Sequence, residues 1–339
     1  MCAAQFCAIG ALFRAARFID NRAQMWYYSD DDMFSIALTN VLITLCYIIP
    51  GFALCKLKKA CADHLSTLSA VLVYVCSPCM IASSMLEFPR SARAMADVAL
   101  FFAVFLLLQL AFMLILFALC RKRYGEAKYR IFTVASVMGN VGFFGLPVVT
   151  ALFPSEPLVG CYSSAYLIGM NLLVFTIGVY AIRRDPSYIS LRAAVLNPTT
   201  LSTLVALPLY LLKIRLPESL NGALSLLGKT TTPLCMIVLG MRLASVELKR
   251  LFSRPFVYGV CAMKLIVYPL VAYGIVLLIP GLDETFRDCM LVLSAAPSAA
   301  VILSLAELHR CEQELSANVV LLTTLASIVT LPLLSLLIA

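Results

Sequence analysis

The sequence predicts an all-α integral membrane protein with ten transmembrane helices, arranged as two inverted five-helix repeats. Three observations support this fold class. Hydrophobic residues make up 62% of the chain and charged residues 13%, whereas a soluble domain carries about 25% charged residues. Ten apolar segments alternate with short polar loops. Two of these segments, one in each half of the chain, contain residues that break helices.

The N-terminal tail, residues 1–32, precedes the first predicted span. Its apolar part, residues 2–13, is shorter than the roughly 20 residues that cross a bilayer, and it lacks the basic start of a signal peptide. Two interpretations remain open: the tail is an interfacial helix, or it is disordered or untranslated, with Met25 or Met33 as the start in place of Met1. We favour a late start, because Met33 opens the first span directly.

The ten apolar segments end at charged residues, proline or glycine. Their expected limits are 33–55, 65–86, 97–120, 129–152, 158–182, 198–214, 218–243, 255–279, 284–306 and 314–338. The first repeat then covers residues 33–182, a short cytoplasmic linker covers 183–197, and the second repeat covers 198–339. Because each repeat holds an odd number of spans, the two repeats are inverted relative to each other.

The basic residues of the loops predict the orientation. Sixteen of them fall in the loops of one side and five in the loops of the other. Loops rich in lysine and arginine stay in the cytoplasm, so we expect the side with sixteen to be cytoplasmic. An even number of spans then places both termini outside, in a multi-pass protein of the cell membrane.

Residues 134–147, VASVMGNVGFFGLP, form the interrupted segment of the first half. Glycine weakens a helix, and proline removes a hydrogen bond and clashes with the preceding turn. Each backbone polar group that is freed in lipid is costly unless protein or water satisfies it. We therefore expect a broken helix here, buried among other helices.

The counterpart in the second half is residues 290–301, MLVLSAAPSAAV. Its Pro297 matches Pro147 of the first half, and Pro78 matches Pro233 in the second span of each half. The two pairs are separated by nearly the same number of residues. Paired breaks indicate a transporter built from repeats, with its substrate site at the midplane. Chance is the alternative, because proline is common in transmembrane helices.

Several motifs resemble the auxin efflux carrier family. They are GNVGFFGLP at 139–147, LNP at 196–198, LGKTTTPLCMIVLGMRL at 227–243 and AAP at 295–297. The resemblance runs from about Met33 to the C-terminus, and the order and spacing of the motifs together are specific. Plant PIN-type members carry a long cytosolic loop between spans five and six, where this chain has only the short linker. The chain is therefore similar to the compact, bacterial-type branch, which includes malonate and malate permeases.

This resemblance implies a fold and a mechanism. Broken helices four and nine would cross, spans 1, 2, 6 and 7 would form a scaffold, and spans 3–5 and 8–10 would form a transport domain that moves like an elevator. Homodimers would meet through the scaffold. The family's crossover prolines correspond to Pro147 and Pro297, and its crossover asparagine corresponds to Asn140. Plant carriers have a second asparagine just before the first proline, where residues 144–146 read FGL here, which argues against auxin as the substrate.

Polar and small residues beside the breaks are the first candidates for a substrate site. The amide of Asn140 can donate to a carboxylate, or it merely satisfies the broken backbone. Gly139 lets helices approach closely or relaxes the backbone. Ser294 and Ser298 flank Pro297, and each either binds substrate or bonds back to its own helix.

Charge indicates the class of substrate. A broken helix exposes a half-helix N-terminus, which behaves as about half a positive charge and offers N–H donors. No acidic residue lies in the middle of a predicted span, so small organic anions, above all carboxylates, suit the site. Lys264 and Lys229 fall near the middle of their spans, and a buried cation usually faces a cavity or a partner. Lys264 then supplies charge to the anion or changes protonation during the cycle; otherwise it snorkels or bonds to backbone carbonyls.

Asn171 completes the set of candidates, because the resemblance places span five in the same domain as Asn140. Hydrogen bonding between helices is the alternative for Asn171, as it is for Asn40 and Asn318. The predicted substrate-binding residues are Asn140, Gly139, Pro147, Ser294, Pro297, Ser298, Asn171 and Lys264.

The function expected from these features is secondary active transport of small organic anions. A sodium-coupled carrier of the bile-acid type, with similar architecture, is the main alternative, and a channel or receptor is the other. The sequence contains no catalytic cluster, phosphate loop or metal spacing, so we expect no enzyme, cofactor or metal. Basic residues occur in short clusters between spans, which argues against nucleic acid. The expected partners are an organic anion, the lipid bilayer and a second copy of the chain.

Overall fold

The computed structural model of the protein describes residues 33–338. The residues within that range that it leaves undescribed are 62–63, 87–90, 157, 184–191, 193–195, 197, 213, 215, 246–251, 253 and 309. The regular secondary structure of the described part is helical, with one isolated β-bridge. The predicted tail and most of the predicted linker lie outside the described residues.

The helices of the first half follow the predicted apolar segments closely. They are α2 (Met33–Cys46), α3 (Ile48–Lys56), α4 (His64–Val71), η1 (Leu72–Cys76), α5 (Ser77–Leu86), α6 (Ala92–Cys120), η2 (Arg121–Arg123), α7 (Ala127–Ala135), η3 (Val141–Gly145), α8 (Leu146–Leu152), α9 (Val159–Leu173), η4 (Val174–Gly178) and α10 (Val179–Arg183). The hydroxyl of Ser91 caps the start of α6 by accepting from Ala94 N–H.

The second half is built from similar pieces. They are α12 (Pro198–Leu211), α13 (Glu218–Lys229), α14 (Thr231–Ser245), α16 (Pro255–Ala262), η6 (Met263–Val267), α17 (Tyr268–Leu277), α18 (Glu284–Ser294), α19 (Ala300–Leu308) and α20 (Gln313–Ser335). Pro198 and Pro255 open α12 and α16, the position where a proline's missing N–H removes no helical hydrogen bond.

Seven helical stretches of the described residues are long and apolar enough to cross a membrane. They are Met33–Lys56, His64–Leu86, Ala92–Arg123, Val159–Ile182, Glu218–Ser245, Pro255–Leu277 and Gln313–Ser335. Val141–Leu152 and Thr200–Tyr210 are shorter apolar helices. The chain is therefore an all-helical integral membrane protein with several spans.

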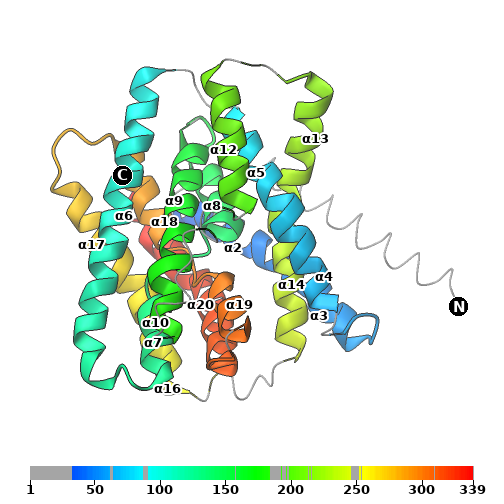
Figure 1. The fold of residues 1–339 in the computed structure, drawn as a ribbon, viewed down its shortest axis with the longest axis vertical. Helices are drawn as coiled ribbons and strands as arrows, with labels where there is room; N and C mark the ends of the chain where they lie inside the picture. The colour runs from blue at the N-terminus through cyan, green and yellow to red at the C-terminus, as the bar shows by residue number, and fades with distance from the viewer. Residues whose placement is uncertain are drawn as a thin grey trace, which may run out of the picture.

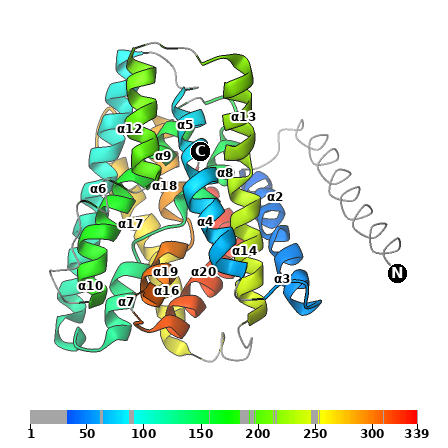
Figure 2. The same cartoon turned by 45° about the vertical axis from the view of Figure 1, so that its right-hand side comes forward.

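The helices gather in two groups. Helices α3, α4, α5, α12, α13 and α14 lie on one side, and α6, α7, α9, α10, α16, α17 and α18 lie on the other (Figure 1). Figure 2 shows α14 following α13, one below the other. Helices α2, α8 and α20 lie between the groups in Figure 1, and α2 packs on both α8 and α20.

The first group is held by a backbone-to-backbone contact between α3 and α14. A Cβ atom on Gly51 would overlap the carbonyl oxygen of Ile237, and a Cβ atom on Gly240 would overlap that of Ile48. Small residues allow helices in a membrane to approach this closely. The second group is joined by aromatic stacks between α6 and α9.

Those stacks pair Phe101 with Tyr162 and Phe105 with Tyr166, with ring centroids 4.5 Å and 4.4 Å apart. Offset aromatic pairs of this kind add about 0.5–1.5 kcal/mol each beyond the area they bury. They fix α9 against α6, and through Tyr166 they reach the helix breaks described below.

Three π-helical turns share one relationship to proline. Helices η1, η3 and η6 end at Cys76, Gly145 and Val267, and in each case proline follows two residues later, at Pro78, Pro147 and Pro269. A proline ring clashes with the carbonyl four residues before it, and that carbonyl lies in the middle of each π-turn. The wider turn makes room for the ring, so the helix continues past each proline.

Candidate functional site at two paired helix breaks

The two breaks predicted from the sequence are present and lie side by side. Helix α7 ends at Ala135 and η3 begins at Val141, while α18 ends at Ser294 and α19 begins at Ala300. The intervening residues pair as an antiparallel bridge between Gly139 and Ser298.

Two backbone hydrogen bonds make this bridge. Asn140 N–H donates to Pro297 O at 2.6 Å, and Ala299 N–H donates to Met138 O at 3.0 Å. Buried backbone groups need partners at membrane depth, and each break supplies them to the other. Pro297 therefore lies at the crossing, as predicted.

The last carbonyls of the two half-helices receive donors from elsewhere in the fold. The Ser298 hydroxyl donates to Ala135 O at the end of α7, with a distance of 2.9 Å. Lys264 Nζ donates to Ser294 O at the end of α18, with a distance of 2.6 Å. Both contacts complement the negative end of a helix dipole.

Asn140 sits at the start of the helix that follows the first break. Its carbonyl oxygen accepts from the N–H groups of Phe144 and Gly145. Its side chain is buried and lies within hydrogen-bonding reach of the Cys235 thiol of α14. The amide thus faces the other group of helices, across the boundary between the two groups.

Lys264 lies inside η6 and is fully buried. Its Nζ is 5.0 Å from the centroid of the Tyr268 ring, a cation–π distance. A Cβ atom on Gly139 would lie 3.0 Å from Lys264 Nζ and 3.4 Å from Ala296 O. The amine therefore lies close beside the bridge, and a side chain at position 139 would crowd it.

A polar chain extends from Lys264 into the apolar core. Tyr268 OH lies 3.3 Å from Tyr166 OH. Gln109 Nε2 lies 3.2 Å from Tyr166 OH, and it donates to Val137 O at 3.4 Å. Because Val137 lies in the first break, this series of side chains leads from Lys264, beside the second break, back to the first break.

The two predicted serines behave differently. The Ser294 hydroxyl bonds back to Leu291 O of its own helix at 2.9 Å, the ordinary alternative for an intramembrane serine. The Ser298 hydroxyl bonds across to α7, and its N–H donates to Thr323 Oγ1 of α20 at 3.1 Å. Ser298 therefore joins three elements at the crossing.

Two candidates lie apart from the bridge. Pro147 is the second residue of α8 and follows the π-turn η3, so it lies in the helix after the crossing and not at the bridge. Asn171 is buried in α9, which packs against η3. Lys229, weighed with Lys264 from the sequence, is exposed at the end of α13.

Gln109, Tyr166, Tyr268, Thr323 and Cys235 belong to the site and were not predicted. Gln109 had a signal, because it is the one polar side chain between residues 98 and 120 of α6, and an isolated polar residue in a span usually has a structural or functional partner. The other four residues gave no such signal in the sequence, since tyrosine, threonine and cysteine are ordinary in membrane helices.

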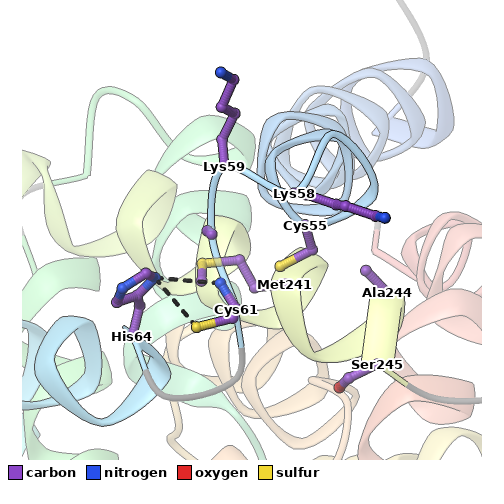
Figure 3. Close-up of a pocket in the computed structure, with 9 residues that line it drawn as sticks. Cys55, Lys58, Lys59, Cys61, His64, Met241, Ala244 and Ser245 are labelled. Atoms are coloured by element: carbon purple, nitrogen blue, oxygen red, sulfur yellow. Dashed lines mark hydrogen bonds between the residues drawn. The ribbon is translucent and has the colours of Figure 1, made fainter.

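A cavity of about 370 Å³ lies elsewhere, where α3 and α14 end. It is lined by Cys55, Lys58, Lys59, Ala60, Cys61, His64, Met241, Ala244 and Ser245. Figure 3 shows the His64 ring turned toward Cys61, whose N–H donates to His64 Nδ1 at 3.2 Å. None of the predicted site residues lines this cavity.

The crossing combines donors that suit an anion. The Asn140 amide and the Lys264 amine are buried beside it, and the half-helices η3 and α19 begin there with the positive ends of their dipoles. Within the described residues, no group of three or more His, Cys, Asp or Glu side chains is placed to hold a metal ion.

Comparison with known proteins identifies the family. A family model described as "Membrane transport protein" matches residues 36–185 and 184–335. An uncharacterized transporter of Methanothermobacter thermautotrophicus is 28% identical over 313 residues, which cover 89% of this chain and 98% of that protein. An uncharacterized transporter of Methanocaldococcus jannaschii is 26% identical over 311 residues, which cover 88% of this chain and 97% of that protein.

A third relative adds the name of a compound. The protein of Rhizobium meliloti named "Putative malonate transporter" is 24% identical over 297 residues, which cover 84% of this chain and 90% of that protein. The family match covers most of the chain, in agreement with the motifs found in the sequence. The chain is a membrane transporter and belongs to the auxin efflux carrier family.

Proposed function

We propose that the protein is a secondary active transporter of small organic anions, chiefly carboxylates. The observation that carries this proposal is the buried Lys264 amine beside two paired helix breaks, 2.6 Å from Ser294 O. A positive group at this depth is expensive unless it serves a partner. A carboxylate is the partner that an ammonium, an amide and helix N-termini bind best.

The substrate-binding residues of this proposal surround the crossing. Asn140 donates to the carboxylate from the scaffold-facing side, and Lys264 supplies the positive charge. Gly139, Pro297, Ser294 and Ser298 shape the crossing. Asn171 and Pro147 lie in the packing around it. The name of the Rhizobium meliloti relative makes malonate and similar small dicarboxylates the first candidates.

The mechanism we propose is elevator-like alternating access. The grouping of α3–α5 with α12–α14, apart from α6, α9, α17 and α18, supports a scaffold and a transport domain. The side chain of Asn140 reaches Cys235 of α14 across the boundary between them. Sliding along this boundary would expose the crossing to one side of the membrane and then to the other.

The arrangement in the membrane is part of the same proposal. Ten spans form two inverted five-helix repeats, both termini lie outside the cell membrane, and two copies meet through the scaffold. The paired breaks in the two halves support a repeated plan.

Thermal stability of the purified protein tests the substrate class. A ligand that binds only the native state stabilises it by about 2.7 kcal/mol at a concentration of a hundred times Kd. We expect malonate, malate or succinate to raise Tm in a saturable way, and neutral malonamide to leave it unchanged. Indole-acetate and a bile acid are tested in the same way as larger carboxylates.

Two results would contradict the proposal. Equal shifts with malonate and malonamide would remove the requirement for charge. The absence of a shift with every carboxylate, in a protein that stays folded in detergent, would mean that the crossing does not bind organic anions.

A further inference from the structure

Lys264 is a buried amine without a carboxylate partner among the described residues. Ion pairs between described residues join Lys128 to Glu126 and Arg254 to Glu314, and these four side chains are 43–53% exposed. Lys264 instead contacts a carbonyl oxygen and the face of a tyrosine ring. Its surroundings therefore resemble those of a bound cation more than those of a salt bridge.

The carbonyl that Lys264 contacts is a particular one. Ser294 O belongs to the last residue of α18, at the negative end of a half-helix dipole. Unwound backbone carbonyls and half-helix C-terminal ends are the groups that coordinate sodium in transporters with broken helices. In this chain, that oxygen is already bound to the Lys264 amine at 2.6 Å.

Space beside the amine is also limited. A Cβ atom on Gly139 would approach Lys264 Nζ to 3.0 Å and Ala296 O to 3.4 Å. The amine therefore lies between η6, the first break and the second break. A separate cation in this position would have to displace it.

We propose that the Lys264 ammonium is a tethered replacement for a coupling cation, so that the protein binds its anion without sodium. This inference rests on the proposed function, because it concerns the charge of the same site. The positive charge that a sodium ion would bring from solution is instead part of the chain. It holds the end of α18 and faces the bound anion at the same time.

Lys229 offers a matched control for a test of the tethered cation. Lys264→Met keeps the length of the side chain and removes the charge, and Lys264→Gln keeps a hydrogen-bond donor without the charge. Lys229→Met removes the other predicted intramembrane lysine, which is exposed at the end of α13. All three variants are compared with the wild type in sodium, choline and methylammonium chloride at equal ionic strength.

The first readout is Tm without any substrate. We expect the wild type and Lys229→Met to give the same Tm in the three salts. Lys264→Met and Lys264→Gln should have a lower Tm in choline and should be raised by methylammonium, which restores the missing cation by mass action. A saturable increase of the wild-type Tm with sodium would overturn the inference, as would Lys264 variants with the wild-type Tm in choline.

The second readout is malonate uptake into proteoliposomes in the same three salts. Uptake by the wild type should be equal in sodium and choline, and uptake by Lys264→Met in choline should fall about tenfold or more, as expected for loss of a hydrogen bond to a charged group. Wild-type uptake that occurs only with sodium would overturn the tethered cation while leaving the organic-anion function intact. Failure of every carboxylate would contradict the proposed function, and the Tm comparison would still decide the role of Lys264.

Discussion

The backbone N–H of Asn140 donates to the carbonyl oxygen of Pro297 at 2.6 Å. This bond joins two segments that are far apart in the chain and places the Asn140 amide beside the end of α18. Because Pro297 has no N–H of its own, it contributes only an acceptor here. The return bond comes from Ala299 N–H to Met138 O, as the antiparallel bridge between Gly139 and Ser298 requires.

Asn140→Ala should weaken substrate binding strongly. A hydrogen bond to a charged group is worth about 1.5–3 kcal/mol, or roughly 10- to 100-fold in Kd. Binding is measured as the ligand-induced shift of Tm. Asn40→Ala is the matched control, because the Asn40 amide donates only within its own helix, to Ile36 O. Wild-type binding by Asn140→Ala would remove this residue from the site.

Lys264→Met should weaken the binding of dicarboxylates more than that of monocarboxylates. A fixed positive charge gains more from a dianion than from a monoanion at the same distance. The measurement compares malonate with its monomethyl ester in both proteins. Equal losses for the two ligands would assign Lys264 a structural role at the end of α18.

Gly240→Leu should destabilise the protein by about 1–3 kcal/mol or more, because overpacking a close contact forces the backbone apart. The added side chain would overlap Ile48 O of α3. Gly222→Leu and Gly274→Leu are controls, since a Cβ atom at either position meets nothing within 4 Å. If thermal unfolding gave the same Tm for all three variants, the contact between α3 and α14 would not hold the first group of helices.

Labelling of introduced cysteines should fix the orientation. Lys58→Cys and Arg123→Cys are expected to react from the cytoplasmic side, and Arg93→Cys from the outer side, because basic loops stay inside. All three positions are exposed. Native cysteines such as Cys61 are also exposed, so the extra label is counted relative to the wild type. The reverse pattern would overturn the predicted topology.

The sequence predicted the helical segments well, because long apolar runs bounded by charge have few other solutions in a membrane. It also predicted that residues 134–147 break. The crossing itself was harder to locate. Glycine and proline mark where a helix can break, but the actual break lies before Val141. There the second half of the chain supplies the Pro297 carbonyl as an acceptor and the Ala299 N–H as a donor.

Pro147 shows the limit of residue type as a guide. A proline can end a helix or be accommodated within it. Here the π-turn η3 makes room for the Pro147 ring, which would otherwise clash with the carbonyl four residues before it. Lys264 was flagged by its polarity, but its contact with Ser294 O depends on how η6 packs against α18. Gln109 was visible in the sequence, whereas its partner Tyr166 could not be known without the packing of α6 on α9.

Uptake of labelled malonate into proteoliposomes that contain an excess of unlabelled malonate tests the central claim most directly. We expect saturable uptake that unlabelled dicarboxylates compete with, and that Asn140→Ala reduces about tenfold or more. Flux that does not saturate would indicate a channel. The absence of uptake with every small carboxylate, in vesicles that hold folded protein, would contradict transport of organic anions through the crossing of the two broken helices.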